Sequence, residues 1–246
     1  MLNGGTLKIT LDLAIQFIYR DSAIWEGVSL LYISAADALK APSFEVTIKE
    51  LMKANPDAMW FESKDSSYMV LDAKQPPETL GSNLQHYFWA EDISSKWQQV
   101  CDALERHSGR VPIKQAVTAI NHSCSILIVE DEPLINKMME HYLSKFGTVT
   151  ATNNYHQAIA NYMVQRTDIV FLDIHYHQGG MDGFDILRNL LIADNNAFIV
   201  MVSGDGTLAT KLQALALGAK GFIVKPFNTS HFSHYITKLT NNNMCL

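Results

Sequence analysis

Three acidic side chains stand next to one another where an apolar segment ends. The segment ILIV (126–129) leads directly into Glu130, Asp131 and Glu132, and Pro133 follows them. Four apolar residues in a row are typical of a strand that is covered on both faces. Because carboxylates this close together repel one another, we expect a positively charged group to lie among them.

Strands and helices alternate along the chain from residue 125 onward. Largely apolar segments predict strands at 126–130, 168–173, 197–203 and 221–225, and TVTAT (148–152) predicts a further strand between the first two of these. Segments with apolar residues at helical spacing lie between them, and a last helix is expected over about 229–240. With right-handed connections, this alternation predicts an α/β fold with a five-stranded, doubly wound parallel sheet.

In doubly wound sheets, functional side chains gather beyond the carboxyl ends of the strands. In chain order, those ends carry Glu130 with Asp131, then Asp173, Ser203 and Lys225. Any one of these residues alone would be an ordinary solvated loop residue. Together, at successive strand ends, they predict one site with three carboxylates, a hydroxyl and an ammonium group.

The composition excludes several classes of protein. The net charge of −6 is shared between the halves of the chain, and there is no polybasic segment or helix-turn-helix pattern, which argues against nucleic-acid binding. Cys101, Cys124 and Cys245 are too far apart for a zinc motif or a disulfide framework. No secretory signal and no apolar segment of membrane-spanning length is found. We therefore expect a cytoplasmic protein that does not bind membranes.

The second half of the sequence resembles the receiver domain of bacterial two-component response regulators. The resemblance covers about residues 125–240 and keeps the order and spacing of the family's motifs. Five segments carry it: ILIVEDE (126–132), IVFLD (169–173), MDGFDIL (181–187), IVMVSG (199–204) and GAKGFIVKPF (218–227).

The resemblance implies a role for each strand-end residue. Asp173 is the phospho-acceptor, which takes a phosphoryl group from a phosphohistidine of a histidine kinase or phosphotransfer protein. Mg²⁺, a hard cation with oxygen ligands, is bound by Asp131 and Asp173, by Glu130 directly or through water, and by the backbone carbonyl of His175.

Four further positions follow from the same resemblance. Ser203 and Lys225 bind the phosphoryl group, and Phe222 occupies the position of the switch aromatic residue. Pro226 follows Lys225 in the family's Lys-Pro step, whose peptide bond is typically cis.

One loop departs from the family pattern. HYHQGGMDG (175–183) is two residues longer than usual and lacks the usual proline, so we expect a more mobile loop after Asp173. His175 and His177, and likewise His231 and His234, could suggest a transition-metal site. Without further ligands nearby in sequence, we interpret both pairs as polar surface.

The first half predicts a second mixed α/β domain. Strands are expected at 15–19, 28–33, 58–61, 67–72 and 86–90. One helix is expected to contain Phe44, Ile48 and Leu51, and another to begin near Ile93 and end near Gly109.

A faint repeat relates the two halves at a shift of 111 residues. It aligns IQFIYRD with ILIVEDE and places Glu62 over Asp173, with RVPIK (110–114) as a counterpart of the last strand. Two interpretations remain open. The first half is either a degenerate receiver-like domain without an acceptor aspartate, or an unrelated α/β module.

The predicted organisation is a module at 1–108, a linker at 109–124, a receiver at 125–240 and a tail at 241–246. VPIKQAVTAI within the linker is expected to form a short helix. The predicted function is a response regulator that is not an enzyme and acts through a downstream protein target or a homodimer. The alternatives are a scaffold that is not phosphorylated, and an enzyme in the first half that the receiver controls.

Overall fold

A computed structural model describes residues 9–34, 44–74, 86–108, 123–175 and 181–240. The chain divides into two compact units, Met1–Lys114 and Gln115–Leu246. Most of the expected linker, the short helix expected within it, RVPIK, His177 and the tail lie outside the described residues. The described part of the C-terminal unit begins just before β5, whose first residue is Cys124.

The C-terminal unit is built on a five-stranded parallel sheet. Its strands are β5 (Cys124–Val129), β6 (Gly147–Thr152), β7 (Ile169–Asp173), β8 (Ile199–Ser203) and β9 (Gly221–Val224). Their order is β6-β5-β7-β8-β9, and every neighbouring pair is parallel. This is the flavodoxin-like order of a doubly wound sheet. The predicted fold of this unit is confirmed.

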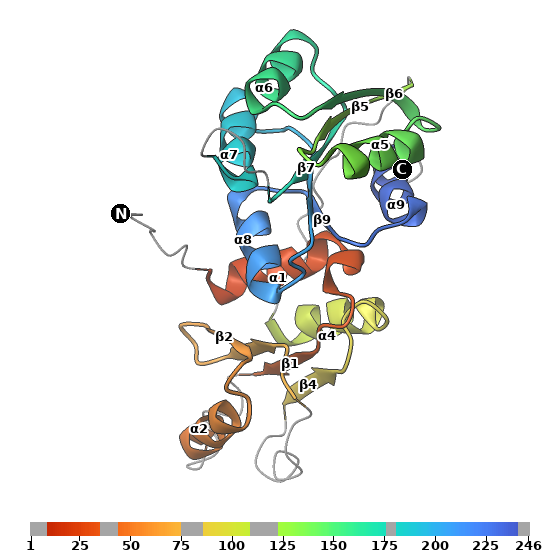
Figure 1. Cartoon of the computed structure of the whole chain (residues 1–246). Coiled ribbons are helices and arrows are strands. Elements are labelled where there is room, and N and C mark those ends of the chain that lie inside the picture. Colours follow the sequence, from red (N-terminus) through yellow and green to blue (C-terminus); the bar gives the residue numbers. More distant parts are fainter. Residues whose placement is uncertain (1–8, 35–43, 75–85, 109–122, 176–180, 241–246) are drawn as a thin grey trace. The chain divides into compact units, whose positions relative to one another are not determined.

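Helices cover both faces of this sheet. They are α5 (Pro133–Leu143), α6 (Tyr155–Val164), α7 (Gly183–Ala193), α8 (Leu208–Leu217) and α9 (Thr229–Thr240). Helices α5 and α9 lie on one side of the sheet, and α6, α7 and α8 lie on the other (Figure 1). The face under α5 and α9 forms an apolar core in which Phe171 packs edge-on against Phe232. Because both faces are covered, the central strands β5, β7 and β8 are largely apolar and buried, whereas the edge strand β6 alternates between exposed threonines and partly buried residues.

The N-terminal unit has a four-stranded antiparallel sheet. Its strands are β1 (Leu30–Ile33), β2 (Met59–Glu62), β3 (Tyr68–Leu71) and β4 (Tyr87–Ala90), in the order β2-β3-β1-β4. The unit also contains α1 (Leu11–Arg20), a 3₁₀ helix (Ser22–Trp25), α2 (Phe44–Ala54) and α4 (Trp97–Ser108). Phe44, Ile48 and Leu51 of α2 pack on Leu31 and Ile33 of β1. The additional α/β domain is therefore confirmed.

One strand prediction for this unit is wrong, and one of the two open interpretations is excluded. IQFIY (15–19) is not a strand but part of α1, because Leu11, Ala14, Ile15 and Ile18 recur at helical spacing and are buried, and Thr10 caps the helix. The interpretation as a degenerate receiver also fails. A receiver requires parallel strands joined by helical crossovers, whereas all three strand pairs here are antiparallel.

Within the described residues, no helix has the length and apolar character needed to span a membrane.

Candidate functional site

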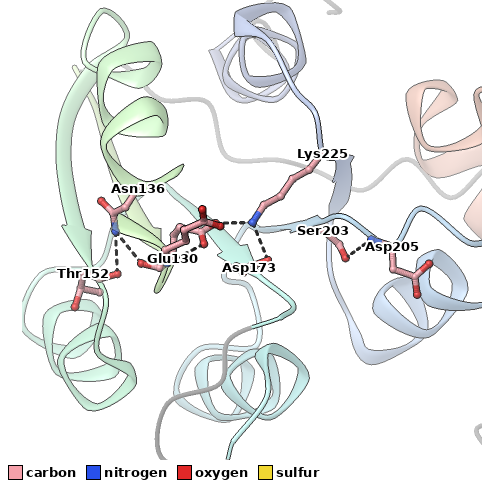
Figure 2. Close-up of polar contacts among 8 residues, drawn as sticks. Glu130, Asn136, Thr152, Asp173, Ser203, Asp205 and Lys225 are labelled. Atoms are coloured by element: carbon pink, nitrogen blue, oxygen red, sulfur yellow. Dashed lines mark hydrogen bonds and ion pairs between the residues drawn. The ribbon is translucent and has the colours of Figure 1, made fainter. Parts of the chain in front are cut away.

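The carboxyl ends of four neighbouring strands bring the predicted site residues to one edge of the sheet. Asp173 and Ser203 are the last residues of β7 and β8, while Glu130 and Lys225 directly follow β5 and β9. Figure 2 shows Glu130, Asp173 and Lys225 pointing toward one another from these separate strands. Parallel strands end at the same edge, so the sheet itself assembles the group.

Three carboxylates form the centre of the site. Glu130, Asp131 and Asp173 each offer an oxygen that lies within 4.8 Å of the other two. Glu130 is 1% exposed and Asp173 is 3% exposed, while Asp131 is half-buried. Among the described residues, no histidine or cysteine joins a group of three metal-binding side chains.

Lys225 supplies positive charge to two of the carboxylates. Its Nζ donates a hydrogen bond to Glu130 Oε2 at 2.8 Å and forms an ion pair with Asp173 Oδ1 at 3.2 Å. Burial alone would lower the pKa of Lys225, but the hydrogen bond to Glu130 and the charges of Asp173 and Glu130 outweigh it and raise that pKa. The lysine is therefore held in its charged form.

One ammonium group does not fully satisfy the two buried carboxylates. Asp173 Oδ1 is buried and has no hydrogen-bond partner among the described residues, since its contact with Lys225 is an ion pair only. Burial raises the pKa of Glu130 to about 7; the charge of Asp173 adds to the rise, and Lys225 opposes it. Lys225 therefore does not fully neutralise the negative charge of these carboxylates, and the site can accept a further cation.

The first residue of α7, Gly183, lies close to the backbone of Asp173. The Gly183 N–H donates to Ile174 O at 3.0 Å. A Cβ atom at Gly183 would lie 2.1 Å from Asp173 O, so only glycine fits there. His175 lies two residues after Asp173 and is exposed.

Ser203 is fully buried at the end of β8. Its Oγ accepts a hydrogen bond from the Asp205 N–H at 3.0 Å, and Asp205 in turn binds Thr207, the N-cap residue of α8. The Asp205 carboxylate accepts hydrogen bonds from Thr207 N at 2.9 Å and Thr210 Oγ1 at 2.6 Å. Figure 2 shows the hydrogen bond between Ser203 and Asp205, and through Asp205 the serine hydroxyl is linked to the start of α8.

Phe222 and Pro226 lie on and just beyond the edge strand β9. Phe222 is 5% exposed, and the hydroxyl of Tyr235 bonds both its N–H and its carbonyl oxygen, each at 3.0 Å. The Lys225–Pro226 peptide bond is cis. His231 Nδ1 accepts a hydrogen bond from Asn228 N at 3.0 Å. This contact is local to the start of α9.

Sequence reasoning did not identify Asn136. Its Nδ2 donates to Glu130 O at 2.9 Å and to Thr152 O at 3.4 Å, which places it directly behind the acidic residues (Figure 2). A polar residue on an otherwise amphipathic helix carries no sequence signal for such a contact. Only the rotation of α5 against the sheet brings this amide to the strand ends.

Comparison with known proteins agrees with this geometry. Residues 126–237 match the family described as response regulator receiver domain. The chemotaxis protein CheY of Thermotoga maritima is 32% identical over 117 residues, which are 47% of this chain and 96% of that protein. CheY of Bacillus subtilis is 35% identical over 118 residues, which are 47% of this chain and 97% of that protein.

A longer relative matches the same region. The nitrogen assimilation regulatory protein NtrX of Azorhizobium caulinodans is 35% identical over 104 residues, which are 42% of this chain and 23% of that protein. The parallel sheet and its acidic edge define the C-terminal unit as a receiver domain. The chain belongs to the response regulator receiver family, as its sequence motifs predicted.

Proposed function

We propose that this chain is a phosphorylation-controlled switch in which Asp173 accepts a phosphoryl group from a phosphohistidine of a histidine kinase or phosphotransfer protein. The observation that carries the proposal is the buried Asp173 carboxylate, which lies at a strand end between an acidic pair and Lys225. The switch then acts through contacts with a downstream protein. In this proposal the chain does not turn over a small-molecule substrate.

The acidic residues fit Mg²⁺. Three carboxylates within 4.8 Å and a buried Asp173 oxygen without a hydrogen-bond partner among the described residues form an oxygen-rich, negatively charged site. Glu130, Asp131, Asp173 and the backbone carbonyl of His175 would hold the ion. When bound, Mg²⁺ neutralises negative charge on the transferring phosphoryl oxygens.

The transfer itself needs one nucleophile and several groups that stabilise charge. A carboxylate oxygen of Asp173 forms a bond to phosphorus while the phosphorus–nitrogen bond to the donor imidazole breaks. The bonding electron pair returns to that imidazole ring. Lys225, 3.2 Å from Asp173 Oδ1, balances charge on the incoming phosphoryl group, and the Ser203 hydroxyl donates a hydrogen bond to one of its oxygens.

Labelling with a small phosphodonor tests the proposal. Incubation with acetyl phosphate and Mg²⁺ should add one phosphoryl group, detected by intact mass and removed by hydroxylamine, because acyl phosphates react with this amine. Asp173→Asn should abolish the label, since an amide is a poor nucleophile. Asp194→Asn, at the end of α7, should leave the label unchanged.

Two results would contradict this proposal. Undiminished labelling of Asp173→Asn would show that another residue is the acceptor. A wild-type chain that takes no label from acetyl phosphate or from a phosphorylated histidine phosphotransfer protein would favour a scaffold that is not phosphorylated.

A further inference from the structure

The side-chain amide of Asn136 joins the ends of two strands at the acidic edge. Asn136 lies near the start of α5, and its Nδ2 reaches the carbonyl oxygens of Glu130 and Thr152. Thr152 O also accepts a hydrogen bond from Glu130 N at 3.2 Å. The amide therefore continues the β5–β6 contact one residue beyond the paired strands, whose last pair is Val129 with Thr152.

The hydrogen bond from Asn136 to the Glu130 carbonyl oxygen is placed to hold the acidic pair, Glu130 and Asp131. The Glu130 carbonyl belongs to the peptide that joins Glu130 to Asp131. Holding that peptide limits the directions in which both carboxylates can point. Glu130 Oε1 also accepts a hydrogen bond from Glu132 N at 3.2 Å, so the turn after β5 is fixed at two points.

Asparagine suits this position because its NH₂ group carries two donors on one atom. Two carbonyl oxygens can therefore be satisfied together, with the 2.9 Å contact to Glu130 O the stronger of the two. Aspartate would place an acceptor against two acceptors, and an apolar residue would leave the buried end of the turn without this donor.

We propose that Asn136 is a positioning residue for the acidic site: it holds the Glu130–Asp131 peptide so that both carboxylates face one cation. This inference rests on the proposed function, because it assumes that the acidic site binds Mg²⁺. Residues behind metal ligands orient those ligands, and their loss weakens metal binding even though they do not touch the ion.

Mg²⁺ titration of the full chain, followed by backbone amide chemical shifts, tests the inference. Asn136→Ala and Asn136→Leu should weaken Mg²⁺ binding by about ten- to a hundredfold. The leucine variant retains most of the side-chain volume, so it separates the loss of the donors from the loss of packing. Asn189→Ala is the matched control, because Asn189 Nδ2 donates to a carbonyl, Asp185 O, at 3.0 Å on α7.

The control separates positioning from stability. Thermal unfolding of all three variants is measured in the absence of metal, where each should lose a similar amount of stability. Only the Asn136 variants should lose Mg²⁺ affinity, whereas a merely structural role would change stability alone.

The remaining outcomes are distinguishable. If wild type binds Mg²⁺ and labels at Asp173 but the Asn136 variants bind Mg²⁺ as well as Asn189→Ala does, the inference is wrong and the proposed function stands. If neither Asn136 variant folds, Asn136 is a residue of the fold and the inference is also wrong. If wild type neither binds Mg²⁺ nor takes a phosphoryl group, both proposals fail.

Discussion

At the scale of single residues, Glu130 is a buried carboxylate whose charge is only partly compensated by its neighbours. Its carboxylate is buried beside Asp173, and the two share the ammonium group of Lys225. Burial, followed by the charge of Asp173, raises the pKa of Glu130 to about 7 against the opposing effect of Lys225. The folded protein therefore retains a proton on Glu130 at pH values where the unfolded chain has lost it.

This difference predicts a pH dependence of stability without metal. Between the ordinary glutamate pKa of 4.5 and a folded pKa of about 7, the folded state binds more protons, so the free energy of unfolding falls as pH rises. The total loss is on the order of 3 kcal/mol. Glu130→Gln, which cannot ionise, should flatten the dependence over this window.

Denaturant unfolding at several pH values, with a chelator present, measures this effect. Glu132→Gln is the control, because Glu132 is exposed and its change should leave the slope unaltered. The same slope in wild type and Glu130→Gln would show that another group binds the proton.

Sequence reasoning reached most of the site at this scale. A parallel sheet fixes where its strands end, so the positions of Glu130, Asp173, Ser203 and Lys225 follow from four apolar segments. The finer contacts do not follow. Which carboxylate Lys225 approaches more closely, and that Asn136 stands behind them, depend on side-chain rotamers and helix rotation, which hydrophobic spacing does not specify.

At the scale of elements, a side chain rather than another strand makes hydrogen bonds to the backbone of the edge strand β9. The Tyr235 hydroxyl of α9 donates to Phe222 O and accepts from Phe222 N, and it is wholly buried. A Cβ atom at Gly221 would lie 2.2 Å from the Tyr235 ring, so glycine there admits the tyrosine. Gly221 makes space for the Tyr235 ring, and the Tyr235 hydroxyl then pairs the backbone N–H and carbonyl of Phe222 on the edge strand.

Substitution of either Tyr235 or Gly221 should lower the stability of the C-terminal unit. Tyr235→Phe keeps the ring but leaves a buried N–H and a buried carbonyl unpaired, and should destabilise the unit by about 1–3 kcal/mol. Gly221→Ala should cost a similar amount, about 1–3 kcal/mol, because the added methyl group overlaps the ring.

Chemical denaturation followed by circular dichroism measures both variants. Tyr142→Phe is the control, because the Tyr142 ring packs on the same core while the residue is only partly buried. Equal stability of Tyr235→Phe and Tyr142→Phe would show that water replaces the hydroxyl at the strand edge.

A second connection between elements runs from Ser203 to α8. If Ser203 Oγ turns to a phosphoryl oxygen, it gives up the Asp205 N–H, and Asp205 is bound to Thr207 and Thr210 in the first turn of α8. A hydrogen bond to a charged oxygen contributes about 1.5–3 kcal/mol. That difference shifts a two-state equilibrium by about ten- to a hundredfold.

Ser203→Ala should therefore still accept a phosphoryl group at Asp173 but fail to pass the change to α8. The measurement is the shift of backbone amide resonances over 205–212 on addition of beryllium fluoride, a phosphoryl mimic, with Mg²⁺. Thr207→Ser, which keeps a capping hydroxyl, is the control. Shifts of equal size in wild type and Ser203→Ala would rule out this route.

At the scale of the whole molecule, the two units differ in how much their sequences reveal. Parallel strands covered on both faces give long apolar segments, and helices must separate them, so the fold of the C-terminal unit follows from the pattern. The strands of the N-terminal unit have four residues each and pair antiparallel. Short apolar segments do not specify their partners, which is why a chance repeat could suggest a second receiver.

Each unit has its own apolar core, and this predicts separate unfolding transitions. Ile128 lies in the core of the C-terminal unit and Ile33 in a core cluster of the N-terminal unit; both are 0% exposed on central strands. Replacing either by valine removes one buried methylene and should cost about 0.5–1.5 kcal/mol. For units of this size, that lowers the melting temperature by about 2–6 °C.

The four tryptophans allow the units to be distinguished. Trp25, Trp60, Trp89 and Trp97 all lie in the N-terminal unit, so tryptophan fluorescence reports its unfolding, whereas far-ultraviolet circular dichroism reports both units. Ile33→Val should lower the midpoint temperature of the transition seen by fluorescence. Ile128→Val should lower the midpoint temperature of the part of the dichroism change that comes from the C-terminal unit. It should leave the midpoint temperature of the fluorescence transition unchanged. If Ile128→Val lowers both transitions equally, the two units unfold as one, and a phosphoryl group at Asp173 would act on the stability of the entire chain.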